Sequence, residues 1–240
     1  ITEPPMIMIN AATSPVTCNG GNDGSILLNI SGGTTPYTYS WNNGQSTSTA
    51  IGLFLGNYSV NIFDANGCLT SNVISVSEPS PLSASISGTD VSCNAGSDGS
   101  TDINVSGGTQ PYSYLWSNGD TIEDLPGIVA GTYTVSIKDS CGDSTTATIL
   151  ITEPAALSSS ATIINVSCNA GTNGVIVITT TGGTPISGAG TNTYTYAWTK
   201  DGAGNAYTPG SGEEVVAGNT VTLSSLGAGV YVCTITDANG

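Results

Sequence analysis

The chain has no histidine and no arginine, and its only basic side chains are two lysines. Without an imidazole it has no Ser–His or Cys–His pair and no histidine base, so we expect no enzymatic activity. The 17 acidic residues give a formal net charge of −15. Contacts to phosphates need a basic surface, and anionic lipid headgroups repel an acidic one. The composition therefore predicts neither a nucleic-acid partner nor an anionic-membrane partner.

Long apolar runs are also missing, because no stretch of the sequence approaches the length of a bilayer span. We therefore expect no membrane insertion in this segment. Only 8% of the residues are charged, and Ser, Thr, Asn and Gly fill their places. The first residue is not a natural start and no signal peptide precedes it, so we expect an excerpt of a longer chain.

None of the six cysteines belongs to a CxxC pair, and a zinc site has few ligands to draw on when histidine is absent. Long-range disulfides are the better interpretation, and they indicate an oxidising, extracellular location. The structural disulfide candidates are Cys18, Cys68, Cys93, Cys141, Cys168 and Cys233.

What the chain does contain is an internal repeat of 75 residues. The step is kept by Glu-Pro, by a cysteine and by two glycines: Glu3, Glu78 and Glu153; Cys18, Cys93 and Cys168; Gly24, Gly99 and Gly174; Gly33, Gly108 and Gly183. It predicts repeats at residues 5–79, 80–154 and 155–240. Residues 1–4 would be the tail of a preceding repeat, and the third repeat would be truncated at its C-terminal end.

Each repeat contains a strand in which aromatic residues alternate with small or polar ones, as in GGTTPYTYSW and GGTQPYSYLW. Alternation places the rings on one face of the strand. We expect this face to be core rather than a sugar platform. A tyrosine before the penultimate strand marks a tyrosine corner. The core tryptophans are Trp41, Trp116 and Trp198, and the corner tyrosines are Tyr58, Tyr133 and Tyr231.

About seven short strands per repeat, separated by Gly-rich and Asn-rich turns, are typical of an antiparallel sandwich. The sequence therefore predicts an all-β fold of three tandem immunoglobulin-like β-sandwiches. Glu-Pro is followed closely by the next strand, and proline restrains both its own backbone and the residue before it. We therefore expect a stiff, extended rod.

The third repeat is longer, with additions around residues 186–193 and 200–219. We expect loops or an extra hairpin there, and this is where a lateral contact or a carbohydrate site would lie. Glu213-Glu214 is the one adjacent acidic pair in this insertion. Neighbouring side chains of an extended strand point opposite ways, so the pair does not favour glycoside hydrolysis.

The loops NGGNDG (residues 19–24) and NAGSDG (residues 94–99) offer oxygens to calcium, with help from a nearby aspartate or a linker glutamate. The alternative is a tight turn, for which Asn, Asp and Gly are favoured by their backbone conformations. Asn173 replaces the aspartate in the third copy, which weakens the metal interpretation. The candidate calcium ligands are Asp23, Asp98, Asp64 and Asp139, and we expect no other cofactor.

The pairing of the cysteines stays open. Spacing favours bonds within a repeat, Cys18–Cys68 and Cys93–Cys141, which would stabilise a small domain by about 4 kcal/mol. Geometry argues against this pairing, because in an immunoglobulin-like strand order the two cysteines of one repeat lie at opposite ends of the sandwich. Two alternatives remain: the first strand is placed differently from that order, or the bond is Cys18–Cys141, which joins neighbouring repeats. We favour pairing within repeats, because it needs no neighbour.

Two expectations concern the third repeat. Asp-Ala-Asn-Gly precedes Cys68 and also forms residues 237–240, so we expect a cysteine to follow Gly240 in the parent protein. Cys233 stands where the other repeats have Val60 and Val135. We expect it to be a buried free thiol unless it pairs with Cys168.

The ordered set GGTxPYxYxW, NG, AGTYTV and DANGC resembles SprB-type repeats, the tandem modules of giant surface adhesins of gliding bacteria. The resemblance implies a non-enzymatic stalk or filament segment of a secreted protein on the bacterial cell surface, associated with the outer membrane. It also implies roles in adhesion and gliding motility. The expected partners are neighbouring repeats, other copies of the filament or surface glycans. The rival hypothesis is a carbohydrate-binding module with its sugar site on the third-repeat insertion.

Overall fold

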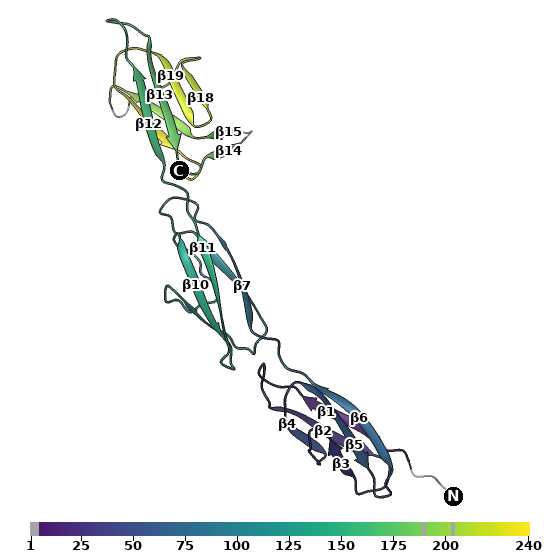
Figure 1. The fold of residues 1–240 in the computed structure, drawn as a ribbon. Coiled ribbons are helices and arrows are strands. Elements are labelled where there is room, and N and C mark those ends of the chain that lie inside the picture. The colour runs from purple at the N-terminus through teal and green to yellow at the C-terminus, as the bar shows by residue number, and fades with distance from the viewer. Residues whose placement is uncertain (1–4, 189–190, 203–204) are drawn as a thin grey trace. The chain divides into compact units, whose positions relative to one another are not determined.

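The structure is a computed structural model that describes residues 5–188, 191–202 and 205–240. The described residues form strands, turns and loops and no helix, so no described helix is long and apolar enough to cross a membrane. The strand pairings of the first and third repeats are all antiparallel, as is the pairing of residues 113–116 with residues 135–138. The all-β, antiparallel fold predicted from the sequence is confirmed (Figure 1). The predicted tail of a preceding repeat, residues 1–4, lies outside the described residues.

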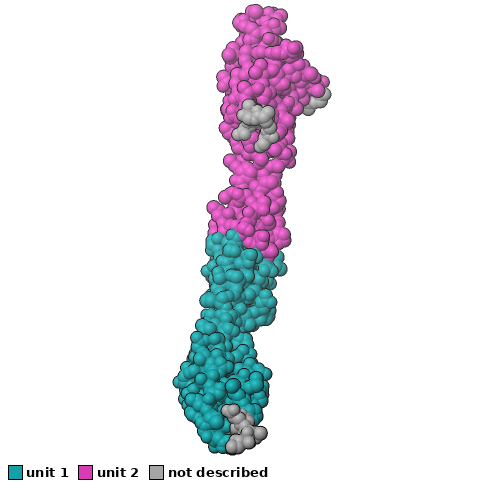
Figure 2. Space-filling model, turned by 90° about the vertical axis from the view of Figure 1, so that its right-hand side faces the viewer, with its two compact units in different colours: residues 1–86, 103–123, 134–148 teal, residues 87–102, 124–133, 149–240 magenta. Residues whose placement is uncertain are grey.

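The chain divides into two compact units, shown in two colours in Figure 2. Unit 1 comprises residues 1–86, 103–123 and 134–148, and unit 2 comprises residues 87–102, 124–133 and 149–240. The division passes through the second 75-residue repeat rather than along its ends. The repeat boundaries at residues 79 and 154 therefore stay a prediction, and the word repeat is used below for these sequence segments.

The first repeat, in unit 1, is built from two three-stranded sheets of order β1-β2-β4 and β3-β5-β6. One hydrophobic cluster, which includes Ile26, Trp41, Leu53 and Val60, draws its buried residues from both sheets. The strands are β1 (Met8–Ser14), β2 (Gly24–Ser31), β3 (Thr38–Trp41), β4 (Thr49–Leu53), β5 (Gly56–Phe63) and β6 (Leu69–Val76).

The alternation of apolar residues sets which face of each strand is buried. In β2, Ile26 and Leu28 are buried while Leu27 between them is exposed. In β5, Val60 and Ile62 are buried and their neighbours are exposed. Since side chains alternate across a strand, one register is enough to place the whole apolar set in the core.

The Gly-Gly pair after β2 is required by a close approach of the backbone. Gly32 has a φ of 75°, and a Cβ built on it would lie 2.0 Å from the carbonyl oxygen of Met6. Gly33 also has a positive φ, and its N–H donates to the carbonyl of Pro5 at 2.7 Å. Only glycine allows the segment before β1 to pass this close.

The second repeat contributes a sheet of order β11-β10-β9 and the strand pair β7-β8. Within unit 1, Trp116 of β9 lies opposite Val135 of β10, and both side chains are buried. Within unit 2, an isolated bridge joins Gly99 to Ile128. The strands are β7 (Ser83–Thr89), β8 (Ser100–Ser106), β9 (Ser113–Trp116), β10 (Gly131–Lys138) and β11 (Ser144–Ile151).

The third repeat, in unit 2, has sheets of order β12-β13-β19-β18 and β17-β16-β20 around Trp198, Val221, Leu223 and Leu226. The addition at residues 186–193 forms the antiparallel pair β14-β15, in line with the expected extra hairpin rather than a loop. Residues 189–190 are outside the described part. The strands are β12 (Ser158–Ile164), β13 (Gly174–Thr181), β14 (Ile186–Gly188), β15 (Thr191–Thr193), β16 (Thr195–Lys200), β17 (Ala206–Tyr207), β18 (Glu214–Ala217), β19 (Thr220–Leu226) and β20 (Tyr231–Thr236).

Candidate functional site: the junctions between repeats

The three tryptophans lie in the cores and not on the surface. Trp41, Trp116 and Trp198 are 4%, 2% and 5% exposed. The indole N–H of Trp41 donates to the carbonyl of Thr47 and that of Trp116 to the carbonyl of Ile122, both at 2.9 Å. A sugar platform needs an exposed ring face, so these indoles stabilise the fold and leave no stacking surface.

The tyrosines fix the turns around these cores. The hydroxyls of Tyr58, Tyr133 and Tyr231 donate to the backbone carbonyls four residues earlier, at 3.1, 2.9 and 3.0 Å. This is the bond expected of a tyrosine corner. A second tyrosine of each repeat ties down the Gly-Gly turn: the hydroxyls of Tyr112 and Tyr194 donate to the carbonyls of Gly107 and Gly182 at 2.6 and 2.8 Å.

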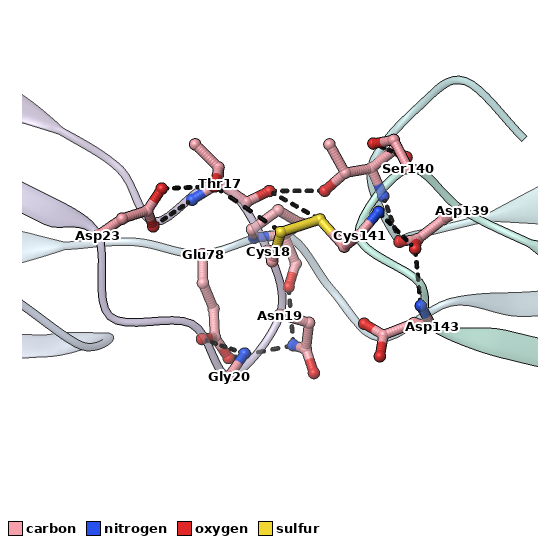
Figure 3. The surroundings of a disulfide bond; sticks show 12 residues. Thr17, Cys18, Asn19, Gly20, Asp23, Glu78, Asp139, Ser140, Cys141 and Asp143 are labelled. Atoms are coloured by element: carbon pink, nitrogen blue, oxygen red, sulfur yellow. Dashed lines mark hydrogen bonds between the residues drawn. A yellow bond between two sulfur atoms is a disulfide. The ribbon is translucent and has the colours of Figure 1, made fainter.

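The junction between the first and second repeats is covalent. A disulfide joins Cys18 to Cys141, with 5.8 Å between the two Cα atoms (Figure 3). The preferred pairing within repeats, Cys18–Cys68 and Cys93–Cys141, is therefore wrong. Cys68 lines a cavity together with Pro5, Met6 and Ile7, before the start of β1. Cys18 follows the end of β1, a seven-residue strand that spans about 23 Å, far beyond disulfide reach.

Hydrogen bonds surround this disulfide. The hydroxyl of Thr109, in the second repeat, donates to the carbonyl of Thr17 at 2.6 Å. Thr17 is itself held by Asp23, whose two carboxylate oxygens accept from its N–H at 2.9 Å and from its hydroxyl at 2.5 Å. These bonds, led by the hydroxyl, lower the pKa of Asp23. The loop before Cys18 therefore has a fixed backbone on which the next repeat can dock.

The Glu-Pro motif acts at the same place. The carboxylate of Glu78 accepts from the side-chain amide of Asn19 at 3.1 Å and from the N–H of Gly20 at 2.9 Å. The same amide also donates to the carbonyl of Pro79 at 2.9 Å. The exit from the first repeat is thereby fastened to the cysteine-bearing loop of that repeat, which restrains the link between repeats.

On the other side of the junction, Cys141 lies in a loop organised by the buried carboxylate of Asp139. One oxygen accepts from the N–H groups of Cys141 and Asp143, both at 2.9 Å, and the other accepts from Thr109, also at 2.9 Å. Bonds from these backbone N–H groups, with that of Thr109 first, lower the pKa of Asp139. Asp64 and Asp237 have lowered pKa values for the same reason in the first and third repeats.

The junction between the second and third repeats, within unit 2, has the same hydrogen bonds without the covalent bond. The hydroxyl of Thr184 donates to the carbonyl of Ser92 at 2.9 Å, as Thr109 does to Thr17. Glu153 accepts from Asn94 at 3.2 Å and from the N–H of Ala95 at 2.7 Å, as Glu78 does in the first repeat.

At this second junction Asn239 takes the place of Cys141, two residues after the loop aspartate. Its side-chain amide donates to the carbonyl of Ser92 at 2.7 Å, where Cys141 has its sulfur 3.8 Å from the carbonyl of Thr17. Cys93 and Asn239 line one cavity of about 260 Å³. Cys93 is free in the structure, so it forms no disulfide in the described part of this junction.

The remaining cysteines are also free. Cys68 and Cys168 are exposed, while Cys233 is half-buried. Burial, and then the charge of Glu214, raises the pKa of the Cys233 thiol to about 11. This thiol is therefore protonated and unreactive at neutral pH.

The candidate calcium residues are used by the protein itself. Asp98 accepts from the N–H of Ser92 at 3.0 Å, as Asp23 does from Thr17. Asn173 makes the same bond in the third repeat, to the N–H of Ser167 at 3.0 Å. An asparagine with the same contact favours the tight-turn interpretation of these loops. The described residues contain no cluster of three or more His, Cys, Asp or Glu side chains that would hold a metal.

The acidic pair of the third-repeat insertion is bonded to its own surroundings. Glu213 accepts from the hydroxyl of Tyr207 at 2.9 Å, and Glu214 accepts from the indole of Trp198 at 3.0 Å. The bond from Gly210 is the main cause of the lowered pKa of Glu213. In the described part of residues 200–219, which omits residues 203–204, these carboxylates therefore act as structural acceptors.

The geometry defines a class of protein: a chain of antiparallel β repeats in which a disulfide and side-chain hydrogen bonds lie at the junctions between repeats. The SprB repeat family matches residues 10–46 and 85–121, two segments that lie 75 residues apart. The resemblance seen in the motifs is thus confirmed at both segments. These matches support a surface-repeat segment of the adhesin type and point to a structural, non-enzymatic role. No curated protein matches the chain.

Solved structures that are similar to this chain match it at low identity and low TM-score. Sidekick-1 immunoglobulin domains 1–5 match at 10% identity and a TM-score of 0.45, covering 99% of this chain and 57% of that one. The N-terminal eight immunoglobulin domains of Down Syndrome Cell Adhesion Molecule isoform 1.30.30 match at 10% identity and a TM-score of 0.40, covering 98% and 44%. This chain thus spans little more than half of the first structure and less than half of the second.

Sequence reasoning missed the junction threonines. Thr34, Thr109 and Thr184 each follow a Gly-Gly pair, and the backbone N–H of each donates to the loop aspartate of its repeat. Their recurrence at a constant place was the available signal. A second signal was the position of the loop cysteine, because Cys68 lies four residues after Asp64 whereas Cys141 lies two after Asp139.

Proposed function

We propose that this segment is a load-bearing part of the stalk or filament of a large secreted cell-surface adhesin, with roles in surface adhesion and gliding motility. The observation that carries the proposal is the covalent junction, in which Cys18 of one repeat is bonded to Cys141 of the next. A disulfide persists in an oxidising compartment, which favours an exported protein. A chain that transmits force between a cell and a surface benefits from junctions that resist separation.

The polar junction chemistry supports the same role. Glu-Pro and the Gly-Gly-Thr turn recur at 75-residue steps; Glu78 fastens the exit of the first repeat to its cysteine-bearing loop, and Thr109 bonds the second repeat to the first. The one acidic pair considered for catalysis, Glu213 and Glu214, accepts hydrogen bonds from Tyr207 and Trp198 and so has a structural role. We propose no enzymatic activity and place the expected partners among neighbouring repeats, other filaments and surface glycans.

The proposal is tested on intact cells that produce the parent protein. Antibodies raised against this segment are expected to label unpermeabilised cells. In-frame deletion of residues 5–154 is expected to weaken attachment under flow and to slow gliding, with an internal tag confirming export of the shortened protein. Normal attachment and gliding of cells that display the shortened protein would refute the proposal.

The carbohydrate-binding alternative is separated by a glycan array. Binding by the 240-residue chain that disappears on deletion of residues 200–219 would support a sugar site on the insertion. We expect no such binding, because Glu213 and Glu214 accept bonds from Tyr207 and Trp198.

A further inference from the structure

The disulfide between Cys18 and Cys141 closes a covalent loop that contains most of the first two repeats. The two cysteines are 123 residues apart in the sequence. Strands β2 to β6 of the first repeat and β7 to β10 of the second lie between them. In the part of the chain that the structure describes, only β1 precedes the loop, and only β11 follows it before the third repeat begins.

A pulling force applied to the two chain ends follows the shortest covalent path. With the disulfide present, that path runs along residues up to Cys18, across the two sulfur atoms, and onward from Cys141. The chain from residue 19 to residue 140 lies outside this path. While the disulfide is intact, the force cannot pull residues 18 and 141 apart, so this segment cannot be stretched out.

The two strands that remain in the force path, β1 and β11, can lengthen only slightly under force. β1 has seven residues and β11 has eight, and both are already extended. A β-strand rises about 3.3 Å per residue, against a limit of about 3.6 Å for a fully stretched chain. Detaching either strand from its neighbour would therefore lengthen the path only slightly.

We propose that the Cys18–Cys141 bond is a redox-controlled limit on extension, which shields the first two repeats from unfolding under load. The proposal rests on the proposed load-bearing function. While the bond is intact, these repeats transmit force through β1, the disulfide and β11. When it is reduced, both repeats enter the force path and can unfold in turn.

The length withheld by the bond is large. A separation of 123 residues, at up to about 3.6 Å per residue, corresponds to about 440 Å of extension. Release of the bond therefore adds this length of chain to the force path. Such an extension would absorb energy in a tether that is overloaded.

The test is single-molecule force spectroscopy of the 240-residue chain, held at its two ends by thiol-free attachments. Non-reducing peptide mapping first establishes that the sample carries the Cys18–Cys141 bond. We expect the fully stretched oxidised chain to be about 440 Å shorter than the Cys141→Ser variant. That variant is expected to show additional unfolding steps from the first two repeats.

Cys68→Ser is the matched control, since it removes a free cysteine and is expected to leave the stretched length unchanged. At constant force, a dithiol reductant should trigger late unfolding steps in the wild-type chain that add up to about 440 Å. In that reaction the reductant is oxidised to its own disulfide, while Cys18 and Cys141 become two thiols. Cys141→Ser should show no such step.

Two outcomes would overturn the inference. One is a mapping result in which Cys18 and Cys141 are free thiols in protein secreted into an oxidising medium. The other is a large unfolding step from residues 1–154 while the bond is intact. Neither outcome depends on adhesion, so the inference can fail while the cell-surface assays succeed, and the reverse also holds.

Discussion

The junction in unit 1 and the junction in unit 2 share one layout of hydrogen bonds and differ at the position of Cys141. Each has a threonine hydroxyl donating to a backbone carbonyl of the previous repeat, and each has a linker glutamate accepting from the cysteine-bearing loop. The first junction adds a disulfide through Cys141, where the second has Asn239. The hydrogen bonds therefore define where two repeats meet, and the presence of the second cysteine determines whether the two repeats are also joined by a disulfide.

The largest expected effect is on the first junction. Cys141→Ser should lower the free energy of unfolding by about 2–5 kcal/mol, because the long loop closed by the bond is no longer constrained in the unfolded chain. Chemical denaturation under non-reducing conditions measures this change. Cys168→Ser, at a free and exposed cysteine, serves as the control. Equal stability of wild type and Cys141→Ser would contradict the assigned role of the bond.

The converse change should make the second junction resemble the first. Asn239→Cys is expected to form a disulfide with Cys93, because the two residues line one cavity and Asn239 occupies the position of Cys141. Intact mass should fall by about 2 Da on oxidation, and the chain should gain up to about 4 kcal/mol of stability. Asn66→Cys, at the same loop position in the first repeat, should not bond to Cys93. Failure of Asn239→Cys to oxidise would show that the two junctions differ in geometry.

A smaller effect is expected at Gly20 and Ala95, the residues that follow Asn19 and Asn94. Gly20 has a φ of 70° and Ala95 a φ of 57°, and each N–H donates to the linker glutamate. A left-handed conformation costs a non-glycine residue about 1 kcal/mol. Ala95→Gly should therefore stabilise the chain by about this amount and Gly20→Ala should destabilise it by as much. Thermal denaturation of both variants checks the opposite signs; two changes of the same sign would contradict the explanation.

The smallest effect at neutral pH concerns the loop aspartates. Their pKa values in the folded chain lie below the ordinary 3.8, because backbone N–H groups donate to the carboxylates. The stability that this provides is present above pH 3.8 and is lost as the pH falls through the folded pKa. Melting temperature should be level from pH 7 to about 5 and decline below about 4.

A variant separates this contribution from general acid effects. Asp139→Asn should be less stable than wild type at pH 7, and the difference should shrink as the pH falls, since protonation removes the same charge from wild type. Asp102→Asn, at an exposed strand position, should show no such convergence. A difference between wild type and Asp139→Asn that stays constant with pH would assign the effect to shape instead of charge.

Much of the fold could be predicted from the sequence, because alternation fixes which side of each strand is buried. Ile26, Leu28, Val60 and Ile62 follow that rule. The disulfide could not be predicted from spacing, since contacts between cysteines depend on which ends of the strands meet. The same spacing rule that favours Cys18–Cys68 ignores the length of β1, which separates them.

The junction hydrogen bonds were harder to predict, because they involve backbone carbonyls that carry no mark in the sequence. Thr17 and Ser92 serve as acceptors through their carbonyl oxygens, which any residue could supply. Only the donor threonines recur after Gly-Gly. The calcium hypothesis for the turn loops rested on the same ambiguity, because carboxylates that bind a metal and carboxylates that cap a turn use the same residue types.

The shared disulfide has a consequence for how such a chain can change in length over evolution. Its two halves are encoded in different repeats, Cys18 in the first and Cys141 in the second. A recombination event that removes residues 80–154 would place the third repeat, with the loop containing Asn239, directly after the first repeat. Cys18 would then have lost its disulfide partner. Gain or loss of a repeat is therefore neutral only when it preserves the order of cysteine-bearing and asparagine-bearing loops, so selection would act on neighbouring repeats as pairs.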